Sequence, residues 1–242
     1  MHRTTIVRLT GFALALSLMG GLTANASAAG ALNGAGSSLI APLMANWSAD
    51  FQARTTAGVN YSAVGSGTGI AQISARTVDF GASDAPMTPA QFSGCNGCVQ
   101  IPWALTATVA AMNVPGFKTL KLSGPVLAKI YLGQITNWND PAIRALNKGK
   151  SLPNLAITPV YRSDGSGDTY VITDYLSRVS GTWKSQVGFA TSVSFPKGVG
   201  GNKNDGVTAI VGSTKGSIGY VSAYYAIQHH LCLLYTSPSP RD

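Results

Sequence analysis

One segment near the middle of the chain constrains the fold more than any other. An apolar, strand-like run from Leu155 to Tyr161 leads into a short polar turn, and the turn opens an amphipathic helix that runs to about Arg178. Gly165 and Gly167 allow the backbone to turn sharply and its N–H groups to converge. The first turn of a helix attracts an anion, because it carries unpaired N–H groups and a partial positive charge. The segment therefore indicates an anion site, although an ordinary glycine turn with a capping serine fits the local pattern equally well.

Serine-bearing turns recur at similar places along the chain. Ser38, Ser66 and Ser166 each precede or open a helical segment. One such serine is only a helix cap, but ligands of α/β folds bind where these turns gather at the carboxyl ends of the strands. Arg162 adds a planar fork of donors suited to a tetrahedral oxyanion, and Asp84 lies in a fourth turn. Together these residues predict a cage for an anion.

Strand-like and helical segments alternate along most of the chain. This alternation favours an α/β architecture with mainly parallel sheets. Thr88-Pro89 and Asp140-Pro141 are typical of helix starts, with a capping side chain followed by proline in the first turn. Residues 33–38 are expected to form a turn of small residues. The expected strands are 59–64, 78–82, 106–113, 155–161 and 217–221, and the other expected helices are 41–53, 70–76, 125–132, 142–146, 207–211 and 223–230.

The amino-acid composition and charge restrict the kinds of molecule that the chain is expected to bind. Hydrophobic residues make up 45% of the 242 residues and charged residues 11%, as in globular proteins. The net charge is +8, and all nine acidic residues are aspartates. The Lys and Arg residues are scattered without a basic run, which argues against nucleic-acid binding. A mild positive field instead suits the capture of small anions.

The N-terminus is typical of an export signal. Arg3 and Arg8 flank the start of an apolar stretch, Leu9 to Leu22, that is short for a permanent membrane anchor. Small residues from Ala24 to Ala28 offer cleavage sites, and no cysteine follows the stretch to accept a lipid. We therefore expect residues 1–28 to be a signal peptide, with a buried N-terminal helix as the alternative.

Two cysteines lie close together in a loop-like segment. Cys95 and Cys98 are candidates for a small disulfide loop, which is the usual state of such a pair outside the cytoplasm. A redox motif or half of a zinc site is the alternative. A metal site is disfavoured, because the chain has no second cysteine pair and no histidine between His2 and His229.

The last residues differ in character from the rest. Residues 232–242 resemble one reading frame of a common sequencing-library adapter and interrupt the helical pattern before them. We expect them to be a non-native tail, with the gene fragment ending near His230 or Leu231. A genuine polar tail is the alternative.

Several motifs, taken in order, resemble the phosphate-binding proteins of bacterial high-affinity phosphate ABC transporters. The resemblance covers roughly residues 33 to 230 and includes a near-complete family signature in Thr77 to Pro86. The other matching segments are Gly34 to Ser38, Gly65-Ser66, Tyr131 to Gly133, Trp138, Arg162 to Gly167, Gly200-Gly201, Asn204 to Gly206 and Gly219 to Val221.

The resemblance implies a two-lobed type II periplasmic binding protein fold, of class α/β. Lobe one is expected at residues 29–104 and lobe two at residues 105–231. In the family the chain then returns to complete lobe one. The fold is therefore expected to be incomplete at the C-terminus.

The resemblance also implies the phosphate contacts. Asp164 corresponds to the acid that braces Arg162, and Leu39, where an aromatic is frequent, would contribute only its backbone N–H. Asp168 stands where threonine is common. Its carboxylate would repel the anion, unless it accepts a ligand proton or caps the helix. The implied contacts are Ser38, Leu39, Ser66, Asp84, Arg162, Ser166, Gly167 and Asp168.

The implied function is the capture of inorganic phosphate and its delivery to the permease and ATPase subunits of an ABC transporter. Asp84 can accept a hydrogen bond only from a proton-bearing anion, which favours phosphate over sulfate. We expect a periplasmic monomer without cofactor or catalytic activity. The alternatives are a binding protein for another oxyanion such as sulfate or molybdate, a secreted phosphatase, or a structural protein. The missing histidine base, phosphate-binding loop motif and repeats argue against the last two.

Overall fold

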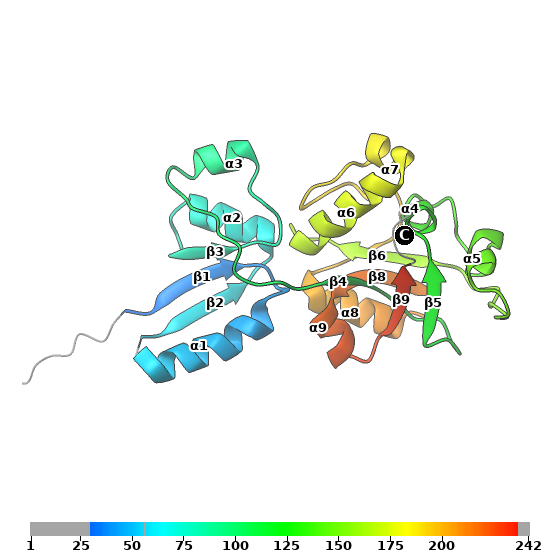
Figure 1. Ribbon diagram of the computed structural model, residues 1–242, viewed down its shortest axis with the longest axis horizontal. Helices are drawn as coiled ribbons and strands as arrows, with labels where there is room; N and C mark the ends of the chain where they lie inside the picture. Colours follow the sequence, from blue (N-terminus) through cyan, green and yellow to red (C-terminus); the bar gives the residue numbers. More distant parts are fainter. Residues whose placement is uncertain (1–29, 56, 237–242) are drawn as a thin grey trace, which may run out of the picture.

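The computed structural model describes residues 30–55 and 57–236, so the expected signal peptide and residues 237–242 lie outside this part of the chain. Two α/β lobes lie next to each other, joined by the segment between α3 (Pro89–Gly94) and β4 (Thr108–Met112) (Figure 1). We call the elements from β1 to α3 lobe one and those from β4 to β9 lobe two. The expected two-lobed α/β fold is confirmed.

Lobe one contains a parallel sheet with the strand order β2-β1-β3. Its strands are β1 (Leu32–Gly36), β2 (Val59–Ala63) and β3 (Phe80–Ala82). Helix α1 (Ala41–Thr55) lies on one face and helix α2 (Ser66–Ser74) on the other (Figure 1). Because the strands are parallel, the turns that follow them gather at one edge of the sheet.

Lobe two contains a mixed sheet with the strand order β5-β9-β4-β8-β6-β7. Strand β6 runs parallel to both of its neighbours, whereas β4 is antiparallel to β8 and β9. Helices α4, α6 and α7 lie on one face of this sheet and α8 and α9 on the other (Figure 1). The elements are β5 (Thr119–Leu122), α4 (Gly124–Tyr131), α5 (Pro141–Leu146), β6 (Thr158–Arg162), α6 (Gly167–Val179), α7 (Gly181–Gln186), β7 (Val199–Gly201), α8 (Lys203–Ser213), β8 (Ser217–Ser222), α9 (Ala223–Gln228) and β9 (Cys232–Thr236). Within the described ranges, we find no helix with the length and apolar character needed to cross a membrane.

Apolar side chains fill both faces of the lobe two sheet. Trp138, Trp183 and Tyr220 are almost fully buried in the larger cluster, which includes residues of α4 and α6. Val207 and Val211 of α8 belong to the smaller cluster. Burial of apolar area of this size is the main stabilising contribution to a domain. It fixes β6 and β8, whose ends carry polar residues toward lobe one.

Three expected helix starts are confirmed by their caps. The Thr88 side chain accepts the N–H of Gln91, and the Gln91 side chain accepts the N–H of Thr88. Asp140 accepts an N–H from the first turn of α5, and Ser166 accepts the N–H of Thr169 in α6. Each cap satisfies a donor that the helix leaves unpaired.

Two expectations about local structure are wrong. Residues 33–38 were expected as a turn, but most of them form β1, the central strand of its sheet. A Cβ at Gly34 would lie 2.1 Å from the ring of Phe80, so close packing explains the small residue there. The second error concerns two helix starts. Helix α2 begins at Ser66 instead of residue 70, and α8 begins at Lys203, earlier than expected, so that Asn204 lies in its first turn.

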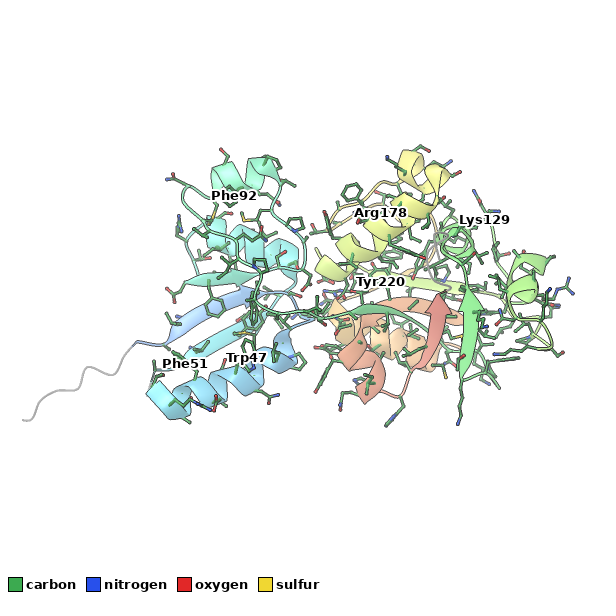
Figure 2. All side chains as sticks on the ribbon, in the orientation of Figure 1. Trp47, Phe51, Phe92, Lys129, Arg178 and Tyr220 are labelled. Atoms are coloured by element: carbon green, nitrogen blue, oxygen red, sulfur yellow. A yellow bond between two sulfur atoms is a disulfide. The ribbon has the colours of Figure 1, made fainter. Side chains whose placement is uncertain are left out.

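Part of α1 is exposed. Trp47 and Phe51 are 50% and 41% exposed (Figure 2). Trp47 contacts Trp103 with a distance of 5.4 Å between ring centroids, and Met44 is the buried residue of the helix. In the described part of the chain, only part of the apolar face of α1 is therefore packed against other residues.

A disulfide links Cys95 to Cys98 just after α3. The guanidinium of Arg76, which follows α2, donates to the carbonyl oxygens of Cys95 and Asn96 at 3.0 and 2.7 Å. The disulfide loop is thus held against the end of α2.

The segment expected to be a foreign tail contributes a strand. Residues 232–236 form β9, which lies between β4 and β5. Strand pairing uses backbone groups that every residue except proline supplies, so the pairing does not distinguish a native strand from a foreign one. The expectation for residues 232–242 stays a prediction.

Candidate functional site

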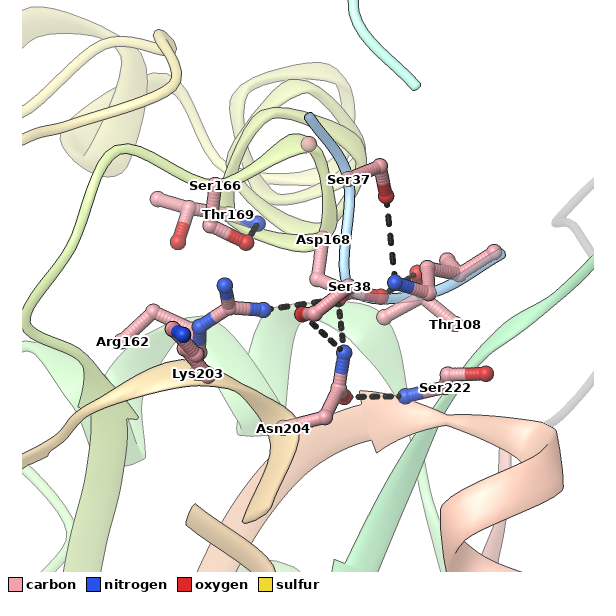
Figure 3. Close-up of polar contacts among 12 residues, drawn as sticks. Ser37, Ser38, Thr108, Arg162, Ser166, Asp168, Thr169, Lys203, Asn204 and Ser222 are labelled. Atoms are coloured by element: carbon pink, nitrogen blue, oxygen red, sulfur yellow. Dashed lines mark hydrogen bonds and ion pairs between the residues drawn. The ribbon is translucent and has the colours of Figure 1, made fainter. Parts of the chain in front are cut away.

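Polar residues of both lobes meet where β1 and β6 end and where α2, α6 and α8 begin (Figure 3). We call this group the polar cage. Most of its side chains are buried. Charged side chains are rarely buried in proteins unless they are paired. The polar cage consists of Ser37, Ser38, Ser66, Asp84, Arg162, Asp164, Ser166, Asp168 and Asn204.

Arg162, the last residue of β6, lies between two carboxylates. Its Nε and Nη2 donate to the two oxygens of Asp164 at 2.7 and 2.5 Å, and its Nη1 donates to Asp168 at 2.9 Å. Its backbone N–H donates to the hydroxyl of Tyr220 at 3.0 Å. Burial lowers the pKa of the guanidinium, but the two carboxylates outweigh it and raise the pKa overall. The guanidinium is therefore charged and fixed in direction.

Asp84 reaches the polar cage from the turn after β3. The hydroxyls of Ser37 and Ser66 donate to its Oδ2 at 2.5 and 3.3 Å. Burial raises the pKa of Asp84 to about 6; the charge of Asp168 adds to this rise, while the serine hydroxyls and Arg162 oppose it. Because Arg162 and Asp168 both act on its pKa, Asp84 shares their electrostatic environment.

Glycines allow the two lobes to approach each other closely. The N–H of Gly67 donates to the carbonyl of Gly165 at 3.0 Å, and the N–H of Gly167 donates to Ser66 Oγ at 3.1 Å. A Cβ on Gly167 would lie 2.3 Å from Asp84 Oδ2, well inside van der Waals contact. The approach therefore requires a residue without a side chain at this position.

Asp168 points toward Arg162 and is 1% exposed (Figure 3). Its Oδ1 accepts from the hydroxyl of Thr108 at 2.6 Å, and its Oδ2 accepts from Arg162 and from Asn204, each at 2.9 Å. Burial raises the pKa of Asp168, and the charge of Arg162 opposes this rise. By contrast, the pKa of Asp164 is lowered, because the hydrogen bond and charge of Arg162 outweigh the effect of burial.

Asn204 is a central residue of the polar cage that sequence reasoning missed. Its Nδ2 donates to Ser38 at 3.1 Å and to Asp168 at 2.9 Å, and its Oδ1 accepts the N–H of Ser222 at 2.8 Å (Figure 3). It thus connects lobe one to lobe two. The Asn-Asp-Gly motif matches the family but is not among the implied contacts, and no local pattern shows that the amide points inward. Thr108 and Tyr220 were missed for the same reason.

The remaining expected residues also lie at the polar cage. The hydroxyl of Ser38 accepts from Asn204, and the N–H of Leu39 donates to Ser37 Oγ at 3.1 Å. The hydroxyl of Ser166 caps α6. The structure therefore brings all of the expected anion contacts to one place, with most of their donors bonded to neighbouring protein groups.

An apolar cavity lies beside the polar cage. Its volume is about 990 Å³, and its lining includes Met44, Ile70 and Phe80 of lobe one together with Asp84 and Thr108. The charged groups that could bind an anion are gathered in the polar cage, so we place the candidate site there. In the described part of the chain, no group of three or more His, Cys, Asp or Glu residues is arranged to hold a metal ion.

Known proteins resemble the chain in sequence and in fold. A phosphate-binding protein PstS of Xylella fastidiosa is 48% identical over 202 residues, covering 83% of this chain and 55% of the relative. A phosphate-binding protein PstS of Pasteurella multocida is 46% identical over 225 residues, covering 92% of this chain and 65% of the relative. The chain thus spans between about half and two thirds of the length of these relatives.

A solved structure supports the fold. The structure of a phosphate-binding protein from Stenotrophomonas maltophilia matches with a TM-score of 0.61 at 20% identity, covering 86% of this chain and 65% of that chain. A family model described as the PBP superfamily domain matches residues 23–232. The chain therefore belongs to the PBP superfamily.

Proposed function

We propose that the protein captures inorganic phosphate between its two lobes and delivers it to the membrane permease of an ABC transporter. The observation that carries the proposal is the buried Arg162, held by Asp164 and sharing one polar cage with Asp84. The relatives named phosphate-binding protein support the choice of ligand. Binding and release without chemical change is the proposed activity, so the protein is not an enzyme.

The roles of the residues follow from their chemistry. Arg162 supplies the positive charge, and Asp164 orients its guanidinium and offsets part of that charge. The backbone N–H groups of Leu39 and Gly167 supply neutral donors. In the structure they donate to Ser37 and Ser66, and when the anion binds they donate to the anion instead. The proposed phosphate contacts are Ser38, Leu39, Ser66, Asp84, Arg162, Ser166, Gly167 and Asp168.

Asp84 is proposed to select the ligand. A carboxylate accepts a hydrogen bond only from an anion that carries a proton, as phosphate does near neutral pH. Fully ionised sulfate would face the charge of Asp84 without a hydrogen bond, in surroundings that are largely closed to water. Selectivity for phosphate over sulfate follows.

Closure of the lobes is proposed to enclose the anion. Hydrogen bonds between Ser66 and Gly167 and between Ser38 and Asn204 join the lobes. The ligand can replace these partners only when the lobes separate, so the lobes are proposed to open and close around it. We propose lobe boundaries at 29–104 and 105–231, with β9 as an addition to lobe two from the expected non-native tail. We also propose that residues 1–28 direct a monomer to the periplasm, where the permease and ATPase subunits receive the phosphate.

Titration calorimetry with phosphate and sulfate tests this proposal. We expect tight binding of phosphate and very weak binding of sulfate by the wild type, and a smaller difference for Asp84→Asn. Asp79→Asn is a control, because Asp79 accepts the N–H of Asn33 in lobe one, outside the polar cage. Equal affinity of the wild type for both anions would reject the mechanism, and binding of sulfate alone would favour the alternative of another oxyanion.

A further inference from the structure

The polar cage holds more negative than positive side chains. Asp84, Asp164 and Asp168 are the carboxylates, and Arg162 is the cation that bonds to two of them. With all four groups ionised, the sum is one positive and three negative charges. Asp164 and Asp168 together more than neutralise Arg162, and the charge of Asp84 has only serine hydroxyls as hydrogen-bond partners among the described side chains. An arriving anion therefore meets a site of net negative charge.

Asp168 contributes one of the two negative charges that Arg162 leaves uncompensated. It is almost fully buried, and its contacts with Thr108, Arg162 and Asn204 keep the carboxylate beside the guanidinium. Its charge also acts on Asp84, so it is felt across the polar cage. A neutral residue at this position would leave one carboxylate fewer against the same arginine.

We propose that Asp168 couples anion capture to the uptake of one proton, so that the site holds the singly charged, doubly protonated form of phosphate in preference to the doubly charged form. This inference rests on the proposed function. Each extra negative charge on the ligand is repelled by the uncompensated carboxylates at short range, where water screens little. The singly charged form also offers two protons to acceptors, and a carboxylate has about four acceptor positions. On Asp168, protein donors occupy three of these positions.

The other titratable groups near Asp168 do not replace this role. The pKa values of Tyr61 on β2, Tyr220 on β8 and Tyr225 on α9 are raised by burial, so these phenols stay neutral near neutral pH. Asp164 stays ionised, because Arg162 lowers its pKa. Lys203 and Asp205 at the start of α8 also lie near; Lys203 donates its backbone N–H to Asp164, and Asp205 acts on Tyr225. Among the groups around Asp168, Asp84 and the ligand therefore remain as those whose charge changes between about pH 6 and pH 8.5.

Calorimetry in two buffers of different ionisation enthalpy measures the protons taken up per phosphate bound. At about pH 8.5, where free phosphate is mainly doubly charged, we expect the wild type to take up close to one proton per phosphate. Its affinity should fall by about tenfold per pH unit above neutrality. Asp168→Asn should reduce the uptake at about pH 8.5, and its affinity relative to the wild type should be about tenfold higher there than at about pH 6. Asp174→Asn removes the same charge from the outer face of α6, where Asp174 pairs with Arg178, and should behave as the wild type.

The outcomes separate the inference from the proposed function. No binding of phosphate by the wild type at either pH would reject the proposed function and the inference with it. Tight binding without proton uptake by the wild type at about pH 8.5 would reject the inference alone, and needs no variant. Equal uptake by a folded Asp168→Asn and the wild type would also overturn it, because the coupling would then belong to other groups.

Discussion

The backbone N–H of Gly167 donates a hydrogen bond to the hydroxyl of Ser66 across 3.1 Å, so the first turn of α6 in lobe two is tied to the first turn of α2 in lobe one. Two helix N-termini thus point at the same small volume. Their partial positive charges add to that of Arg162 and oppose the excess of carboxylates.

Gly167→Ala should prevent the lobes from closing. Its Cβ would lie 2.3 Å from Asp84 Oδ2, so either the lobes separate or Asp84 moves away from the serines. We expect the phosphate affinity to fall at least about tenfold with little loss of stability, as measured by calorimetry and urea unfolding. Gly181→Ala, at the first position of α7, is the matched control, because a Cβ there has no heavy atom within 4 Å. Wild-type affinity in Gly167→Ala would contradict the close approach.

Asp84→Asn should change the pH dependence of stability. The pKa of Asp84 is about 6 in the folded protein against its ordinary value of 3.8, so the folded state binds more protons in this range. The stabilisation by protonation is full below about pH 4 and is lost as the pH rises through about 6. From pH 4 to pH 7 the variant should therefore gain roughly 3 kcal/mol in free energy of unfolding relative to the wild type. Urea unfolding at both pH values measures the difference, and parallel curves would refute the burial of this carboxyl.

Arg162→Ala should weaken phosphate binding by a few kcal/mol and destabilise the fold by about 3–5 kcal/mol, because buried carboxylates lose their partner. Arg162→Ala combined with Asp168→Asn should cost less than the sum of the single changes, since one unpaired charge disappears. A double-mutant cycle by urea unfolding measures the coupling. Strict additivity would mean that the pair contributes little.

Asn204→Ala should lower the free energy of unfolding by about 1–3 kcal/mol, because the N–H of Ser222 and a carboxylate oxygen of Asp168 each lose a buried partner. The variant also loses the hydrogen bond to Ser38, so the phosphate affinity should fall. Asn154→Ala is the control, since its side-chain bond to Asn137 is exposed. Equal stability of the two variants would contradict the buried hydrogen bonds of Asn204 in the polar cage.

Much of the fold was predictable from local patterns. The turn at Ser166 and the caps at Thr88 and Asp140 are decided by nearby residues, and the structure agrees with them, whereas α2 begins earlier than expected, at Ser66. Short strands were missed: β5 and β7 have only four and three residues, too few for a period of two to be visible. Strand β1 was misassigned, because its glycines resemble a turn, although Gly34 is required by packing against Phe80 and Gly36 by the close approach of the Ala82 backbone.

The charged residues of the site were predictable, but their partners were not. Arg162, Asp164 and Asp168 lie within a few residues of one another, so a single motif contains them. The amide of Asn204 and the hydroxyls of Thr108 and Tyr220 reach the same place from distant elements. Such meetings depend on how β4, β8 and α8 pack, and no local period encodes that packing.

Strand β5 has β9 as its neighbour in the sheet, although residues 123–231 separate the two along the chain. During synthesis, residues 119–122 therefore have no strand to join until nearly the whole of the described chain has left the ribosome. Long-range pairing of this kind slows folding. The outer edge of lobe two is therefore the last part of its sheet that can form.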